Sequence, residues 1–314
     1  MQIPYDIFEI ISFNLMKPTL LILAAGMGSR YGGLKQVEPI GPNGEVIMDY
    51  SIYDAIRAGF GKVVFVIRKS FAGEFKELFD HKLRGKIETE YVFQELEYLP
   101  EGYSVPPDRK KPWGTAHAIL VTKDVIKEPF CQLNADDFYG YKAFRSMAGF
   151  LSGSLKPHQY SMIGYKLRNT LSEFGSVSRG ICDVDPDNYL QKIVETTKIY
   201  KERGEIVSLE PDGDVRYLTG DESVSMNIWG FQPDIFKIIE EKFIKFLDYN
   251  GHLPKSEIFI PSVVYEIITE QRATVEVLKG DSLWFGVTYQ EDKPYVVSRV
   301  RKLIEDGEYP EKLF

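Results

Sequence analysis

The chain has 314 residues, 44% hydrophobic and 27% charged, which is enough for one large folded domain or two smaller ones. Its formal net charge of −8 argues against a nucleic-acid partner, because proteins that coat nucleic acid normally carry a basic surplus. No apolar run approaches the roughly 20 residues that span a membrane, so we expect no membrane partner.

The cysteines and the first residues indicate a cytoplasmic protein. Two cysteines, Cys131 and Cys182, are too few to stabilise a chain of this length through disulfide bonds, and they show no metal-ligand spacing. This is typical of reduced thiols that pack in the interior. Residues 1–15 carry no Lys or Arg and lack a small-residue cleavage site, so we do not expect a signal peptide. Because Met16-Lys17-Pro18 leads into an apolar strand, we expect residues 1–15 to be an N-terminal extension.

The first half of the chain alternates between strand-like and helical patterns. Short apolar, β-branched runs predict strands at residues 20–25, 62–67, 87–94 and 130–134. Helical spacing of apolar residues fills the gaps, at residues 48–60, 71–83 and 116–126. This rhythm predicts a Rossmann-like parallel sheet with helices on both faces.

After about residue 155 the predicted strands outnumber the helices. Strands are predicted at residues 160–167, 190–196, 206–209, 223–231, 274–279 and 283–288, with a hairpin turn at residues 211–213. Helices are predicted at residues 233–247, 260–270 and 290–306. No linker separates the halves. We therefore expect an α/β fold with a mixed, mostly parallel sheet, a single domain over residues 16–314 and a smaller β-rich region in its second half.

A glycine-rich loop, LAAGMGSRYGGLK at residues 23–35, follows the first predicted strand. Glycines let backbone amides approach phosphate oxygens closely, and Arg30 and Lys35 add two positive charges. A dinucleotide-binding GxGxxG motif fails here at Tyr31, and a Walker A motif fails at Leu34. The loop therefore predicts a phosphate site of another kind, and an NADP oxidoreductase is the least favoured function.

LAAGMGSR followed by Lys35 resembles the signature of the nucleotide-diphospho-sugar pyrophosphorylases, the sugar-1-phosphate nucleotidyltransferases. In that family the loop wraps the triphosphate of an incoming NTP, and its Arg and Lys stabilise the displaced pyrophosphate. The resemblance thus implies catalytic roles for Arg30 and Lys35. It assigns nucleotide binding to four loop residues: Ala25, Gly26, Gly28 and Ser29. The short gap between Arg30 and Lys35 also occurs in the cytidylyl branch of the superfamily.

A second segment fits the nucleotide side of the same family. Gln94 ends the third predicted strand, and residues 112–118, PWGTAHA, are similar to the family's P-x-G-T-A-x-A. An amide can donate to and accept from a base edge, and a glycine allows close approach of the backbone. The resemblance implies that Gln94, Gly114 and Thr115 bind the nucleobase.

A pair of carboxylates follows the fourth predicted strand, at the edge where parallel sheets bind ligands. The segment resembles the family's G-D-N/D, whose first Asp coordinates Mg²⁺. We expect Asp136 to be the catalytic metal ligand, Mg²⁺ the cofactor and Asp137 a supporting residue, with an exchange of roles left open.

The family's second metal-binding carboxylate has no direct counterpart, since Gly286 and Thr288 occupy the usual positions. Asp281 and Asp292 are candidates to supply it. Otherwise Asp136, substrate phosphates and water hold the ion.

Sugar-side positions of the family match more loosely. Its Y-G-x-V, E-K-P and N-x-G segments imply sugar contacts from Gly175, Glu195 and Asn227. The Lys that grips the sugar phosphate is replaced by Thr196, with Lys192 and Lys198 as candidates to substitute for it.

The resemblance implies a Mg²⁺-assisted nucleotidyltransferase whose partners are an NTP and a sugar-1-phosphate, with homo-oligomer formation left open. The NTP side would occupy residues 16–155 and the acceptor side residues 156–314. Three alternatives share part of the pattern: a cytidylyltransferase acting on a non-sugar phosphate, a glycosyltransferase, and a catalytically weak regulatory protein that binds sugar nucleotides.

Overall fold

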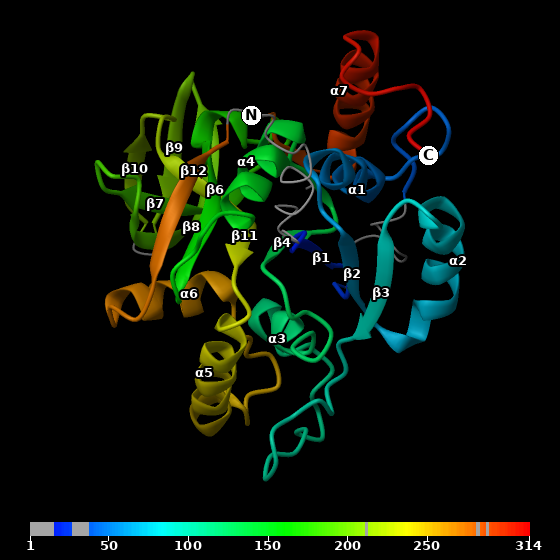
Figure 1. Ribbon diagram of the computed structural model, residues 1–314. Coiled ribbons are helices and arrows are strands. Elements are labelled where there is room, and N and C mark those ends of the chain that lie inside the picture. Colours follow the sequence, from blue (N-terminus) through cyan, green and yellow to red (C-terminus); the bar gives the residue numbers. More distant parts are fainter. Residues whose placement is uncertain (1–15, 27–37, 211–212, 281–282, 287–288) are drawn as a thin grey trace, which may run out of the picture.

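The computed structural model describes residues 16–26, 38–210, 213–280, 283–286 and 289–314, and it confirms the expected α/β fold (Figure 1). One mixed sheet runs in the order β10-β9-β8-β7-β11-β4-β1-β2-β3, with β6 and β12 joined to it beside β11. Helices lie on both sides of this sheet. The proposed extension at residues 1–15 falls outside the described residues.

The parallel half of the sheet consists of neighbours β4-β1-β2-β3. Their bounds are β1 (Thr19–Leu23), β2 (Lys62–Ile67), β3 (Glu88–Phe93) and β4 (Phe130–Asn134). Side chains alternate between the two faces, so Leu20 and Ile22 enter one core cluster and Leu21 enters another. Burial on both faces explains why β1, β2 and β4 read as mostly apolar runs, whereas β3, at the end of the strand order, is only partly buried.

The other half of the sheet is largely antiparallel and joins the parallel half where β11 pairs with β4. Its strands are β6 (Gln159–Lys166), β7 (Val177–Val184), β8 (Leu190–Glu202), β9 (Glu205–Leu209), β10 (Val215–Leu218), β11 (Ser223–Phe231) and β12 (Thr274–Lys279). The antiparallel β9–β10 pair confirms the predicted hairpin, although residues 211–212 of its tip lie outside the described residues.

Two helical layers sandwich the sheet. One core cluster lies under α1 (Ile47–Ala58), α2 (Ala72–Leu83) and α4 (Tyr141–Leu151). The second lies under α3 (Thr115–Leu120), α5 (Ile235–Asn250) and α6 (Ile260–Thr269). Among the described residues, no helix is both long and apolar enough to cross a membrane.

Three of these elements, β7, β10 and α4, lie outside the strands and helices predicted from the sequence. In β7, Ser178, Arg179 and Gly180 interrupt the apolar alternation, and β10 leaves most of its side chains exposed. α4 does carry a helical signal, because its buried residues Ala143, Phe144, Met147, Ala148 and Leu151 recur at helical spacing. The interrupted strands lacked the pattern on which strand prediction depends.

Two predicted boundaries move furthest. α3 ends at Leu120 rather than at Ile126, and the Thr122 hydroxyl donates to the Ile119 carbonyl at 2.7 Å just beyond it. Thr favours such local bonds over continued helix. β8 continues past its predicted end at Thr196 because its pairing with β9 extends the ladder to Glu202.

The C-terminal helix α7 (Lys293–Glu305) builds a third core cluster. It packs near a small antiparallel sheet of β5 (Asp137–Phe138) and β13 (Phe285–Gly286), in which Phe138 and Phe285 stack at 4.2 Å between ring centroids. Only Phe285–Gly286 of the strand predicted at residues 283–288 forms this pair, and residues 287–288 lie outside the described residues.

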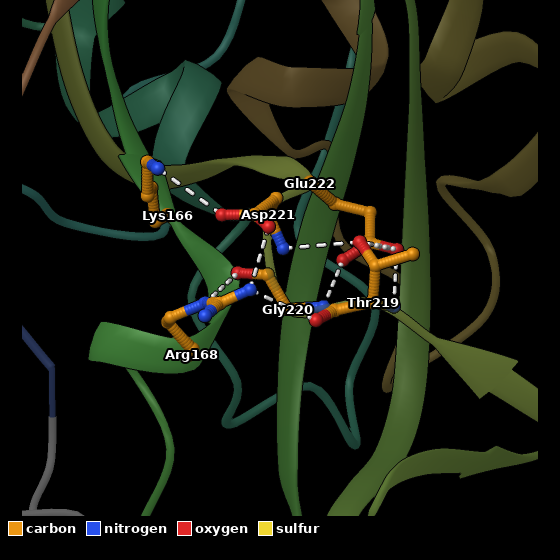
Figure 2. A network of polar contacts seen from close by, with 6 residues as sticks. All are labelled: Lys166, Arg168, Thr219, Gly220, Asp221 and Glu222. Carbon is orange, nitrogen blue, oxygen red and sulfur yellow. Dashed lines mark hydrogen bonds and ion pairs between the residues drawn. The ribbon is translucent and has the colours of Figure 1, made fainter.

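A polar network closes the turn between β10 and β11 (Figure 2). Asp221 pairs with Lys166 at 3.1 Å and with Arg168 at 2.6 Å. The Glu222 carboxylate accepts from the Gly220 backbone N–H at 2.7 Å. Gly220 has a φ of +85°, and a Cβ there would lie 2.7 Å from the Ile206 side chain. The turn therefore favours glycine for its backbone conformation, and a larger residue would also have to displace the Ile206 side chain.

We expect Gly220→Ala to lower the free energy of unfolding by about 1–3 kcal/mol, because it adds backbone strain and a clash. Gly149→Ala is the matched control, since Gly149 lies in α4 and a Cβ added to it would meet nothing within 4 Å. This control should gain about 0.5–1 kcal/mol from helix propensity. Urea unfolding measures both, and equal effects of the two variants would contradict the assignment.

Candidate active site

The carboxyl ends of four parallel strands bring together the motifs of the first half. Leu23 of β1 pairs with Asn134 of β4, so Ala25 and Gly26 leave the sheet beside Asp136. Gln94 follows β3 two strands away along the same edge. This is the edge at which open α/β sheets bind ligands. Four predicted residues of the glycine-rich loop lie outside the described residues: Gly28, Ser29, Arg30 and Lys35.

Gln94 lies buried in a hydrogen-bonded group with Gly114 and His117. Its Nε2 donates to the Gly114 carbonyl at 3.0 Å and lies 3.3 Å from His117 Nδ1. His117 Nε2 lies 2.8 Å from the Tyr98 carbonyl, which can only accept, so the imidazole carries its proton on Nε2. Nδ1 is then an acceptor for Gln94. These contacts engage Nε2 and fix the orientation of the amide, so Oε1 is the side-chain polar atom of Gln94 that can face a ligand.

Burial lowers the pKa of His117 to about 4, with the Tyr98 contact opposing and the charge of Arg109 reinforcing the shift. The imidazole is therefore neutral at physiological pH, as its acceptor role toward Gln94 requires. A small cavity of about 140 Å³ lies beside this group and is lined by both Gln94 and His117.

Gly114 and Thr115 form the start of α3 against a segment from the second half of the chain. Gly114 has a φ of +114°, and a Cβ there would lie 2.3 Å from the Ile258 carbonyl oxygen. The Thr115 hydroxyl accepts from the Ile260 backbone N–H at 3.0 Å. Glycine thus permits a close backbone contact between the two halves.

A larger cavity of about 380 Å³ opens between the halves of the sheet. Three sequence-predicted residues line it: Thr115, Glu195 and Asn227. Asp137, predicted as the supporting carboxylate, lines it as well. Residues without a predicted role also line it, among them Asn134, Arg179 and Trp284. Predicted nucleotide-side and acceptor-side residues therefore meet in one cavity.

A directional chain of hydrogen bonds crosses the floor of this cavity. Trp229 Nε1 donates to Asn227 Oδ1 at 3.0 Å, and Asn227 Nδ2 donates to Asn134 Oδ1 at 2.6 Å. Asn134 Nδ2 in turn donates to Asp137 Oδ2 at 3.1 Å. An indole N–H can only donate, so this first bond fixes the orientation of both amides. Asn227 supports the chain from a left-handed backbone, with φ of 60°.

Asp136 and Asp137 form a carboxylate pair at the end of β4. Burial raises the pKa of the Asp137 carboxyl, and the charge of Asp136 raises it further. A Cβ on Gly286 would lie 2.6 Å from Asp137 Oδ1, so glycine at this position leaves room for the Asp137 carboxylate. Asp137, rather than Asp136, lines the larger cavity.

The described residues contain no group of three or more His, Cys, Asp or Glu side chains placed to hold a metal. A carboxylate pair is nonetheless sufficient for Mg²⁺, which usually binds one or two carboxylates together with substrate phosphates and water. Burial is the main cause of the raised pKa of Asp137, and the charge of Asp136 adds to it. A cation beside the pair would relieve the repulsion between the two carboxylates. The residues present thus fit this ion.

Asp292 has both carboxylate oxygens engaged by the protein. Oδ1 accepts from the Ser172 hydroxyl at 3.0 Å, and Oδ2 accepts from the Tyr289 backbone N–H at 2.7 Å. Asp292 therefore has a structural task beside the loop that carries Gly175. The other candidate for the second metal ligand, Asp281, lies outside the described residues, as does Thr288, which occupies one of the usual positions.

Two predicted sugar contacts differ in their surroundings. Burial raises the pKa of the Glu195 carboxyl, and the charge of Arg179 opposes this shift. Gly175 lies beside Tyr289 instead, where a Cβ would come within 2.7 Å of the phenol oxygen. The hydroxyl of Tyr289 donates to the Ser176 carbonyl at 2.6 Å. Gly175 is thus required for packing of this loop.

The family model described as nucleotidyl transferase matches residues 19–287. This chain belongs to the nucleotidyl transferase family. The match confirms the resemblance drawn from the glycine-rich loop and the Gln94, Gly114 and Asp136 segments. A search of curated proteins finds no match.

Solved structures share the fold of this nucleotidyl transferase chain. An inositol-1-phosphate CTP transferase from T. maritima is 15% identical, with a TM-score of 0.57, and the match covers 91% of this chain and 97% of that one. A UDP-glucose pyrophosphorylase complexed with UDP-glucose is 18% identical, with a TM-score of 0.53 and coverage of 91% and 99%. HddC from Yersinia pseudotuberculosis is 14% identical, with a TM-score of 0.55 and coverage of 90% and 99%.

The directional chain predicts that Asn134→Asp destabilises the protein. The substitution keeps the shape but replaces the N–H that faces Asp137 with an oxygen, so two carboxylates oppose each other. We expect a loss of about 1–3 kcal/mol in the free energy of unfolding at neutral pH. Asn188→Asp, on an exposed turn, is the control and should change stability little. Equal urea midpoints for the two variants would refute the assigned direction of the chain.

His117 predicts a pH dependence of stability. Its folded pKa of about 4 lies below its unfolded value near 6.5, so its neutral form stabilises the fold above pH 6.5. That contribution is lost as pH falls from 6.5 to 4, by at most about 1.4 kcal/mol per pH unit. Across this window the free energy of unfolding should change less with pH in His117→Gln than in the wild type. The exposed control His252→Gln should show the same pH dependence as the wild type. Parallel wild-type and His117→Gln profiles would rule the effect out.

Proposed function

We propose that this nucleotidyl transferase joins an NTP to a sugar-1-phosphate and releases pyrophosphate. The observation that carries the proposal is the cavity shared by the predicted nucleotide-side residue Thr115 and the predicted acceptor-side residues Glu195 and Asn227. It lies beside the strand ends that carry Gly26 and Asp136. In this proposal residues 16–155 serve the NTP and residues 156–314 serve the acceptor, within one domain.

In the proposed reaction an oxygen of the acceptor phosphate attacks the α-phosphorus of the NTP in line. The new P–O bond forms as the bond to the β-phosphate oxygen breaks, and pyrophosphate carries away the charge. Catalysis then consists of positioning and of stabilising charge. Arg30 and Lys35 would stabilise the leaving pyrophosphate, and Ala25, Gly26, Gly28 and Ser29 would bind the triphosphate.

Gln94, Gly114 and Thr115 would position the nucleobase. Gln94 Nε2 is engaged by Gly114 and His117, so the amide presents Oε1, an acceptor, to a ligand. A base bound there would offer an N–H to Gln94. On the acceptor side, Glu195 and Asn227 would contact sugar hydroxyls, while Gly175 shapes the adjoining loop.

Asp136, with Asp137 beside it, would hold Mg²⁺. When bound there, the ion supplies positive charge to the phosphate oxygens. Asp137 is kept in place by Asn134 and Tyr139, whose hydroxyl lies 3.2 Å from Asp137 Oδ2. These neighbours hold one carboxylate of the pair in a fixed position.

The test is pyrophosphate release across ATP, GTP, CTP, UTP and dTTP, crossed with several hexose-1-phosphates and inositol-1-phosphate, with and without Mg²⁺. We expect turnover with at least one hexose-1-phosphate only when Mg²⁺ is present. Lys35→Ala should lower the rate by about 10²–10³-fold, comparable to loss of an oxyanion donor. Lys237→Ala, an exposed cation on α5, is the matched control.

The same panel separates the rival functions. Turnover with CTP and a non-sugar phosphate alone would identify a cytidylyltransferase. Binding of sugar nucleotides without pyrophosphate release from any pair would identify a regulatory protein. A Lys35→Ala variant as active as the wild type would contradict the proposed catalytic loop.

A further inference from the structure

The acceptor side of the larger cavity lacks the lysine that the family resemblance expects to bind the substrate phosphate. Thr196 stands where the family resemblance expects a phosphate-binding lysine. Lys192 and Lys198, the nearby alternatives on β8, are both exposed, and neither belongs to the described residues that line the cavity. A phosphate monoester carries up to two negative charges, so a cation must be found elsewhere.

Arg179 lies at the required place on the neighbouring strand. In the antiparallel β7–β8 ladder Arg179 is the direct partner of Thr196, and Gly180 is the partner of Glu195. Side chains of directly paired residues lie on the same face of a sheet, about 4.5–5.5 Å apart at Cβ. An irregularity of register between Val177 and Arg179 precedes this pair, and such irregularities re-aim side chains. Arg179 lines the cavity although it is only 9% exposed.

The hydrogen bonds of Arg179 leave donors for a ligand. Its Nε contacts the Thr170 carbonyl and hydroxyl, both at 3.2 Å, its Nη2 donates to the same carbonyl, and its Nη1 donates to the Ser178 carbonyl at 2.8 Å. A guanidinium has five N–H groups. Within the described residues these contacts engage three of them, so one N–H on each terminal nitrogen remains for an anion.

The charge of Arg179 is not matched by a close carboxylate. In the described parts of the chain no ion pair within 4.0 Å involves Arg179, although Asp137, Glu195 and Asp292 act on it from farther away. Burial lowers the pKa of the guanidinium to about 10, which leaves it charged at neutral pH. A buried guanidinium held by carbonyls, with its Cζ 5.0 Å from the Trp284 ring centroid, is prepared for a planar, paired contact with phosphate oxygens.

We propose that Arg179 binds the phosphate monoester of the acceptor substrate and replaces, from β7, the lysine missing at Thr196 of β8. This proposal rests on the proposed function for its choice of substrate. It identifies Arg179 as a residue that selects phosphorylated acceptors over their unphosphorylated counterparts. Arginine at this position offers a forked contact that a lysine cannot make.

A purely structural role for Arg179 would anchor the Thr170 loop to the sheet, and the test must separate the two roles. Inorganic phosphate is the probe, titrated by isothermal calorimetry into the full chain. The variants are Arg179→Met, Arg179→Met with Thr196→Lys, and Arg216→Met as a matched arginine control, exposed on β10 of the same sheet. Circular dichroism and thermal melting verify that each variant is folded.

We expect Arg179→Met to weaken phosphate binding by about 10–100-fold, the usual effect of losing a hydrogen bond to a charged group. Thr196→Lys in that background should restore most of the affinity, because it returns a cation to the paired position. Arg216→Met should bind as the wild type does. Wild-type affinity in Arg179→Met, or no recovery with Thr196→Lys, would overturn the proposal.

If Arg179→Met does not fold, Thr196→Glu provides the second test with Arg179 in place. The new carboxylate would compete with phosphate for the guanidinium and should weaken phosphate binding by about tenfold. Unchanged phosphate affinity in Thr196→Glu would equally refute the proposal.

The kinetic readout distinguishes this proposal from the proposed function. With an active NTP and acceptor pair, Arg179→Met should raise KM for the phosphorylated acceptor by about 10–100-fold and leave KM for the NTP within about twofold. Loss of phosphate binding without any pyrophosphate release from the wild type would support the Arg179 site and refute the proposed reaction. If the wild type is active and Arg179→Met keeps the wild-type KM for the acceptor, the proposed reaction would be supported and the Arg179 site refuted.

Discussion

One directional hydrogen bond determines much of the candidate site. The indole N–H of Trp229 has no capacity to accept, so Asn227 must turn its oxygen toward it. Asn227 then donates from Nδ2 to Asn134 Oδ1, which orients the Asn134 amide so that its Nδ2 donates to the Asp137 carboxylate. The chain of bonds runs from β11 to β4, where the antiparallel and parallel halves of the sheet meet. A carboxylate beside the proposed metal ligand thus takes its position from a residue on the other half of the sheet.

The two halves depend on each other elsewhere as well. Gly114, at the proposed base-binding end, permits contact with Ile258 from the second half. Ala116 donates its backbone N–H to the same Ile258 carbonyl at 3.2 Å. The parallel half contributes strand ends with short loops, which suit phosphate and base recognition. The antiparallel half contributes a long ladder whose side chains reach the cavity from the side. Neither half contains a complete set of the candidate residues.

The fold was predictable where information is local. β2, β4 and β11 begin and end at the predicted residues, because each is a mostly apolar run whose side chains pack into the core. β12 also keeps its predicted bounds, through an alternation that places Val275 and Val277 in the core. The strand-end positions of Gly26, Gln94 and Asp136 follow from the same topology. Arg179 was not predictable, since its importance depends on which β8 residue lies opposite it. A lone histidine such as His117 likewise has no sequence signature for its contact with Gln94.

The packing of the carboxylate turn has a consequence for the end of the chain. Phe138, directly after Asp137, stacks on Phe285, and both belong to the cluster that includes Val296, Val300 and Tyr309. Linkage between two sites is reciprocal. Substrate that steadies the Asp136–Asp137 turn would therefore slow amide exchange in α7. By the same coupling, a partner that bound α7 would change the affinity of the Asp136–Asp137 turn for substrate.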